Sequence, residues 1–174
     1  MAATLFAVAV LSACATESSA TLPPLRAPAA TDEPAAADAA AAALAAYTGY
    51  LAAAEEAEHE ADHNHPDLKK YLGDPLLTQV RLGIREAKEH GAMRTGSLIS
   101  EPTVTEVNLD SVPATVVIQD CLDATNYRMV YADDTDKLVP GMQVGRYLAT
   151  ATATRYDDGR WLISNGSAHR DQPC

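Results

Sequence analysis

The histidines that follow an alanine-rich segment are the first residues of this sequence that could do chemistry. The stretch from His59 to His63 reads HEADH and matches the pattern H-E-x-x-H, in which two histidines bind zinc and the glutamate activates water. Catalytic zinc needs a third protein ligand, and the glycine and third histidine of the extended pattern do not follow His63. We therefore favour a solvated helix face for His59 and His63, and zinc binding is a remote alternative.

Asp120 is the second candidate, because it lies within a predicted strand. Side chains alternate between the two faces of a strand, and Asp120 shares its face with three apolar residues, Val116, Ile118 and Leu122. A carboxylate on the core face would have its pKa raised by desolvation and could act as a general base. We favour the other interpretation, in which Asp120 is solvated near the strand end, because the sequence places no second titrating partner beside it.

Tyrosines are the main bulky aromatic residues of the chain, which contains seven Tyr, one Phe and one Trp. A tyrosine hydroxyl close to Asp120 could donate a hydrogen bond to a developing enolate. The same side chains could line a ligand pocket, or they could simply fill the core, which is the default for large aromatic residues. The candidates for a ligand pocket are Tyr47, Tyr50, Tyr127 and Tyr147.

Three helices are expected to position these residues. An alanine-rich run over 31–62 begins with capping and first-turn residues and predicts a long helix. A short helical turn follows over 67–72. The third helix is predicted over 74–91, where an Asp-Pro start, a stripe of apolar residues and a terminal glycine occur together.

The remaining chain is typical of an antiparallel meander. Two alternating runs, 144–156 and 160–165, flank an acidic turn closed by Gly159, which is a strong hairpin signal. In the first run one face carries Tyr147, Ala149, Ala151 and Ala153. An acidic loop is expected around Asp134, and the other predicted strands are 98–100, 103–109, 114–122 and 127–131. Helices followed by such a meander predict an α+β domain whose helices cover one face of the sheet.

The order of these elements resembles that of the nuclear transport factor 2-like superfamily of cone-shaped α+β domains. The resemblance covers 36–174 and includes the glycine-marked entry into a strongly curved sheet and a closing Asp-Gly-Arg-Trp hairpin at 158–161. The strand end Asp-Cys-Leu-Asp at 120–123 and the terminal Cys174 are similar to exported, lipid-anchored actinobacterial members. For Asp120 the resemblance implies the general-base role of inward carboxylates in ketosteroid isomerases and polyketide cyclases.

The first residues are expected to direct export. The apolar segment 5–11 is about half of the ~20 residues needed to span a bilayer and indicates a signal peptide over 1–13. Its end, Leu-Ser-Ala-Cys, resembles the bacterial lipoprotein motif and makes Cys14 the lipid anchor, although an ordinary cleaved signal is the alternative. A flexible stalk is expected over 14–30 and a domain over 31–174. Such signals begin with basic residues, which are missing here, so the translation start is expected to lie upstream.

The cysteine count agrees with export. Three cysteines are an odd number for an exported protein, but lipidation of Cys14 leaves Cys121 and Cys174 to pair in an oxidising compartment. Two free thiols are the alternative. A bond between them would tie the C-terminus to a strand.

Charge narrows the range of partners. The chain has 24 acidic and 13 basic residues and a net charge of -11, which argues against a nucleic-acid partner. We expect no cofactor. The leading prediction is a non-catalytic, extracytoplasmic domain that is anchored to the cell membrane and binds a small apolar ligand or an envelope protein, or forms a homodimer. The alternative is an isomerase- or cyclase-like enzyme with Asp120 as base.

Overall fold

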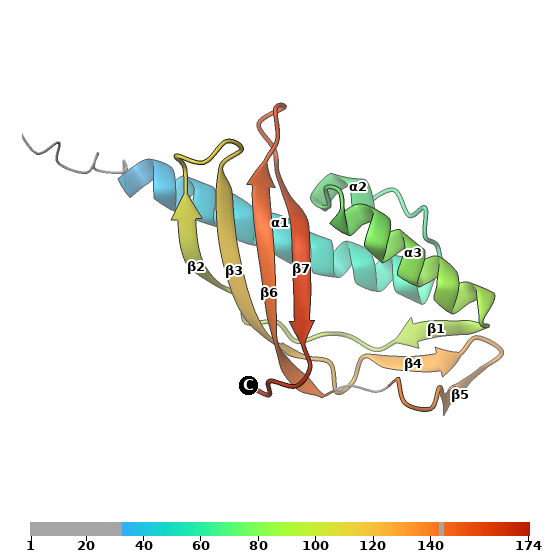
Figure 1. The fold of residues 1–174 in the computed structure, drawn as a ribbon. Coiled ribbons are helices and arrows are strands. Elements are labelled where there is room, and N and C mark those ends of the chain that lie inside the picture. Colours follow the sequence, from blue (N-terminus) through green and yellow to red (C-terminus); the bar gives the residue numbers. More distant parts are fainter. Residues whose placement is uncertain (1–32, 143–144) are drawn as a thin grey trace, which may run out of the picture. The chain divides into compact units, whose positions relative to one another are not determined.

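The computed structural model describes residues 33–142 and 145–174 (Figure 1). The predictions for the signal peptide, the stalk and Cys14 lie outside these residues. The helices are α1 (Glu33–His59), α2 (Leu68–Tyr71) and α3 (Leu76–Glu89). The strands are β1 (Ala92–Thr95), β2 (Thr103–Asn108), β3 (Thr115–Asp123), β4 (Arg128–Tyr131), β5 (Asp134–Leu138), β6 (Arg146–Arg155) and β7 (Trp161–His169).

The predicted α+β class is confirmed, and the strands form two open antiparallel sheets rather than one. The larger sheet has the order β2-β3-β6-β7 and the smaller one has the order β1-β4-β5. An isolated antiparallel bridge pairs Ile99, which lies between β1 and β2, with Asp123 at the end of β3. The chain passes between the two sheets at both of these points. Figure 1 shows α1 lying along one face of the larger sheet and α3 beside β1 of the smaller one.

The core lies between α1 and the inner face of the larger sheet. Helix α1 buries mostly alanines, which allow its backbone to approach the sheet closely. The sheet contributes Val116, Ile118, Leu122, Ala149, Ala151, Ala153 and Ile163. The predicted alternation in β6 is confirmed, because Ala149, Ala151 and Ala153 are all buried. The β6–β7 hairpin is also confirmed, and Gly159 adopts a φ of 83° in its turn.

Several predicted boundaries were wrong. Helix α1 ends at His59 rather than near Asp62, and Ala61 follows with a left-handed φ of 49°. Residues 98–100 make only the single bridge at Ile99 and form no strand. Strands β1 and β5 were missed. All five residues of β5 are exposed, so this edge strand shows no alternation and is held by its backbone pairing with β4.

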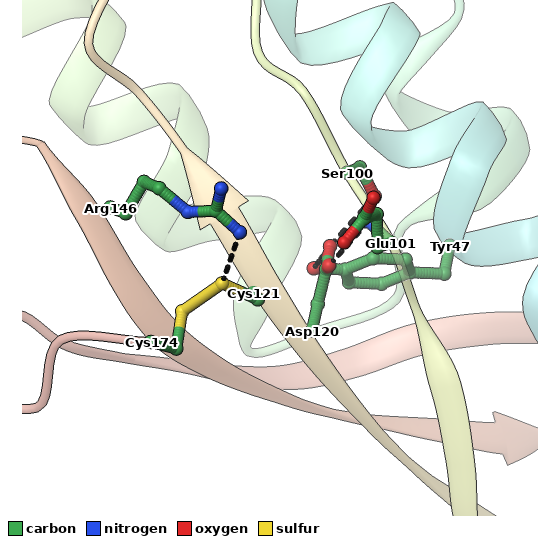
Figure 2. The surroundings of a disulfide bond; sticks show 7 residues. All are labelled: Tyr47, Ser100, Glu101, Asp120, Cys121, Arg146 and Cys174. Atoms are coloured by element: carbon green, nitrogen blue, oxygen red, sulfur yellow. Dashed lines mark hydrogen bonds between the residues drawn. A yellow bond between two sulfur atoms is a disulfide. The ribbon is translucent and has the colours of Figure 1, made fainter.

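The predicted disulfide is present between Cys121 of β3 and Cys174, with their Cα atoms 5.8 Å apart. The bond fastens the C-terminal segment to the outer side of the larger sheet, and the Arg146 guanidinium donates to the Cys121 sulfur over 3.1 Å (Figure 2). Among the described helices, none is both long and apolar enough to cross a membrane.

Replacement by alanine is expected to have opposite effects on stability at two helical glycines, Gly49 and Gly83. A Cβ atom on Gly49 in α1 would collide with the Tyr71 ring, whereas a Cβ atom on Gly83 in α3 would meet no atom within 4 Å. Alanine normally stabilises a helix interior by about 0.5–1 kcal/mol relative to glycine, and overpacking costs about 1–3 kcal/mol. We therefore expect Gly49→Ala to lower and Gly83→Ala to raise the free energy of urea unfolding. Stabilisation by both substitutions would show that Tyr71 does not pack on α1.

Candidate functional site

Asp120 lies in the core, and the favoured prediction that it is solvated was wrong. Asp120 is only 2% exposed, because its side chain lies on the inner face of β3, as that of Ile118 does. Three donors surround its carboxylate (Figure 2). The Tyr47 hydroxyl and the Ser100 hydroxyl donate to Oδ2 over 3.0 and 2.7 Å, and the Glu101 backbone N–H donates to Oδ1 over 2.7 Å.

These hydrogen bonds join three parts of the chain: β3, α1 and the segment that leads into β2. Burial, and then the negative charge of Asp120, raises the pKa of Tyr47, so its hydroxyl stays a donor at neutral pH. Asp120 does not line any of the hollows described below. The arrangement therefore positions α1 and Ser100 on β3, and both carboxylate oxygens are already occupied by protein donors.

A second polar cluster, which the sequence analysis missed, joins the end of α1 to the smaller sheet. The Arg94 Nε atom of β1 lies 3.0 Å from Oε2 of Glu58, and the Tyr127 hydroxyl donates to the same oxygen over 2.6 Å. Arg94 also donates to the Tyr127 carbonyl over 3.3 Å, and its guanidinium lies 5.0 Å from the centre of the Tyr127 ring. Burial raises the pKa of the Glu58 carboxyl, although Arg94 and Tyr127 favour its ionised form.

The Glu58–Arg94 pair forms one wall of a pocket of about 430 Å³ between α3 and the smaller sheet, which we call the methionine pocket. Its volume lies in the range of small-molecule sites, about 300–1,000 Å³. Other polar residues at its edge are Glu86 and His90. Its apolar lining consists of Ala61, Ile84, Ala87, Ala92, Met93, Met129, Val139 and Met142. Flexible methionines suit a surface that adapts to apolar ligands.

A smaller hollow of about 200 Å³, which we call the tyrosine hollow, shares Glu58 and Arg94 with the methionine pocket. Tyr50, Tyr127 and Tyr147 line it together with Arg170, so the structure brings three of the four predicted tyrosines together. A third hollow of about 170 Å³ shares Tyr50 and Tyr147 with the tyrosine hollow and is also lined by Tyr47. Tyr47 itself is only 3% exposed and mainly fills the core.

The histidines do not form the site that the H-E-x-x-H pattern predicts. Because α1 ends at His59, His63 lies beyond the helix rather than one helical turn along it. The ring centres of His59 and Tyr127 lie 5.9 Å apart, so His59 packs against this aromatic residue and is half-buried rather than solvated. Within the described part of the chain, no group of three potential ligands could hold a metal ion.

Comparisons with known proteins give no family. No protein-family model matches the chain, and no curated protein matches it. Among solved structures, the chain is similar to the crystal structure of the intermembrane space region of the chloroplast protein ARC6. The sequence identity is 16%, the TM-score is 0.46, and the match covers 74% of this chain and 95% of that one.

The site residues that sequence reasoning missed are Glu58, Arg94 and the methionines at 93, 129 and 142. Glu58 stands in an acidic stretch that resembles a solvated helix face, and Arg94 belongs to the short β1, which was not predicted. The methionines are far apart in sequence: pairing of β1 with β4 brings Met93 close to Met129, and Met142 reaches the pocket from the segment after β5. Of the residues in this cluster, the sequence predicted only Tyr127 as a pocket residue, and its hydroxyl does contact Glu58.

Proposed function

We propose that this protein is a lipid-anchored protein of the cell envelope that binds a small apolar ligand without catalysing a reaction. The observation that carries the proposal is the methionine pocket, which has a mostly apolar lining and one partly buried ion pair at its wall. The domain would be a nuclear transport factor 2-like fold, supported by three helices that precede an open antiparallel arrangement of strands.

The lipid anchor at Cys14 rests on the sequence motif Leu-Ser-Ala-Cys. The Cys121–Cys174 disulfide supports an oxidising, extracytoplasmic compartment. If the anchor is correct, Cys14→Ala moves the protein from the membrane fraction to the soluble exported fraction. Retention in the membrane without loss of lipid mass would place the anchor elsewhere.

An isomerase- or cyclase-like enzyme is the second candidate, and the hydrogen bond from Tyr47 to Asp120 is the observation that favours it. A general base must reach a proton of the substrate, however, and Asp120 is only 2% exposed and accepts bonds from Ser100 and Glu101 as well. Binding of a protein partner or of a second copy is the remaining possibility, and it would leave the methionine pocket unused.

Methionine methyl NMR tests the ligand proposal, because three of the four methionines of the chain line the pocket. We expect 1-decanol, a neutral apolar probe, to shift the methyl signals of Met93, Met129 and Met142 in the full chain. Ala87→Phe fills the pocket with a larger side chain and should abolish these shifts. The absence of any shift in the unsubstituted protein would overturn the proposed function.

A further inference from the structure

The tyrosine hollow presents hydrogen-bond donors that have no acceptor. Among residues 33–142 and 145–174, neither the Tyr50 hydroxyl nor the Tyr147 hydroxyl has a hydrogen-bond partner. Burial, followed by the charge of Glu58, raises the pKa of Tyr50 to about 12. Burial also raises the pKa of Tyr147, against the opposing effect of Arg170 and Arg94. Both hydroxyls therefore remain protonated at neutral pH and can donate to a ligand.

The charge of the hollow is positive although the chain carries a net charge of -11. Glu58 and Arg94 form an ion pair at 3.0 Å and offset each other. Arg170 also lines the hollow, and no carboxylate in the described part of the chain pairs with it. Two hydroxyl donors and one unbalanced guanidinium together match the acceptor-only oxygens of a carboxylate.

The tyrosine hollow and the methionine pocket are neighbours, because the Glu58–Arg94 pair lines both. The lining of the methionine pocket is mostly apolar, whereas the tyrosine hollow carries the donors. A single elongated ligand with an apolar body and a polar head therefore matches the two spaces better than a wholly apolar ligand does.

We propose that the tyrosine hollow is a subsite for the carboxylate head of an amphipathic organic acid whose apolar body occupies the methionine pocket. This inference rests on the proposed function, because it names the ligand class of the same site. Arg170 and Tyr147 bind the carboxylate, and Met93, Met129 and Met142 contact the body. The Glu58–Arg94 pair, which lines both spaces, borders the junction of head and body.

A matched series of ten-carbon probes tests the ligand class. Decanoate, 1-decanol and decylamine have the same chain and differ in the charge of the head. We expect decanoate to shift the methionine methyl signals of the full chain with an apparent Kd about tenfold lower than that of 1-decanol, because charge-assisted hydrogen bonds are stronger than neutral ones. Decylamine should bind more weakly than 1-decanol.

Substitution of the head subsite provides the control. Arg170→Gln and Tyr147→Phe should each remove most of the preference for decanoate and leave the affinity for 1-decanol unchanged. Arg160→Gln removes the same charge at the β6–β7 turn, where Arg160 pairs with Asp158, and should leave the preference intact.

The possible results separate the two proposals. Equal affinities for decanoate and 1-decanol, or an equal loss of both in Arg170→Gln, would overturn the carboxylate subsite and leave the apolar pocket standing. Failure of every probe to move a methionine signal would overturn both. A decanoate preference that survives in Arg170→Gln and Tyr147→Phe would place the carboxylate elsewhere and would also overturn the subsite.

Discussion

Replacing Asp120 by alanine is expected to lower the free energy of unfolding by about 3–5 kcal/mol, because it leaves one buried and two partly buried donors without an acceptor. The Tyr47 hydroxyl, the Ser100 hydroxyl and the Glu101 N–H all donate to this carboxylate. The substitution also removes the hydrogen bonds that connect α1 and the segment before β2 to β3. Urea unfolding followed by circular dichroism measures the loss.

A matched variant, Asp136→Ala, distinguishes the loss of these hydrogen bonds from the mere removal of one negative charge. Asp136 lies on β5, where every residue is exposed, so Asp136→Ala should change the free energy of unfolding by less than about 0.5 kcal/mol. Tyr47→Phe removes one of the three donors and should cost about 1–2 kcal/mol, which is less than Asp120→Ala costs. If Asp120→Ala and Asp136→Ala were equally stable, the structural role of Asp120 would be refuted.

Loss of the Cys121–Cys174 disulfide is also expected to lower the free energy of unfolding by a large amount. Cys121 and Cys174 are separated by 53 residues in sequence, and in the chain-entropy model a loop of this size is worth about 4 kcal/mol. Cys174→Ser should therefore lower the free energy of unfolding of the oxidised protein by about 3–4 kcal/mol. The disulfide also holds the C-terminal segment that follows β7, and Arg170 of the tyrosine hollow lies in this segment.

Reduction supplies the control for this prediction. A reducing agent should bring the unsubstituted protein down to the stability of Cys174→Ser and should leave the variant itself unchanged. If the unsubstituted protein unfolds at the same urea concentration with and without the reducing agent, the bond does not form in solution or does not stabilise the fold.

The elements with strong periodicity could be predicted from the sequence. Strands β3 and β6 alternate between core and outer faces, and β7, the hairpin partner of β6, follows from the turn at Gly159. The alanine-rich α1 and the capped α3 were also predictable. Strands β1 and β5 were not, because they are short, carry charged residues and are fixed by pairing with β4 rather than by a pattern of their own.

The sequence could predict that the Asp120 side chain lies on the core face of β3, but it could not predict the hydrogen-bond donors around its carboxylate. Alternation along β3 places its side chain among Ile118 and Leu122. Its donors come from α1 and from irregular backbone at Ser100 and Glu101, and the path of such a segment is set by tertiary contacts. The preference for a solvated carboxylate failed because the sequence cannot show how many donors a buried oxygen will meet.

The Glu58–Arg94 pair was missed for a related reason. Hydrophobic periodicity identifies the buried stripe of a helix, and the charged residues in the last turn of α1 do not belong to that stripe. Glu58 is partly buried, with 27% of its side chain exposed, because the smaller sheet covers the end of α1. That cover depends on β1, which no pattern predicted, so the pocket beside it had no sequence signature.

Native mass spectrometry of the membrane-extracted protein shows whether the methionine pocket holds a small ligand. The protein is extracted from the membrane of the producing cells in a neutral detergent, with no ligand added. We predict a second mass that exceeds that of the lipidated protein by the mass of one small organic acid, and we predict that Ala87→Phe lacks this second mass. Detection of the lipidated protein without this second mass in the unsubstituted sample would contradict ligand binding in the methionine pocket.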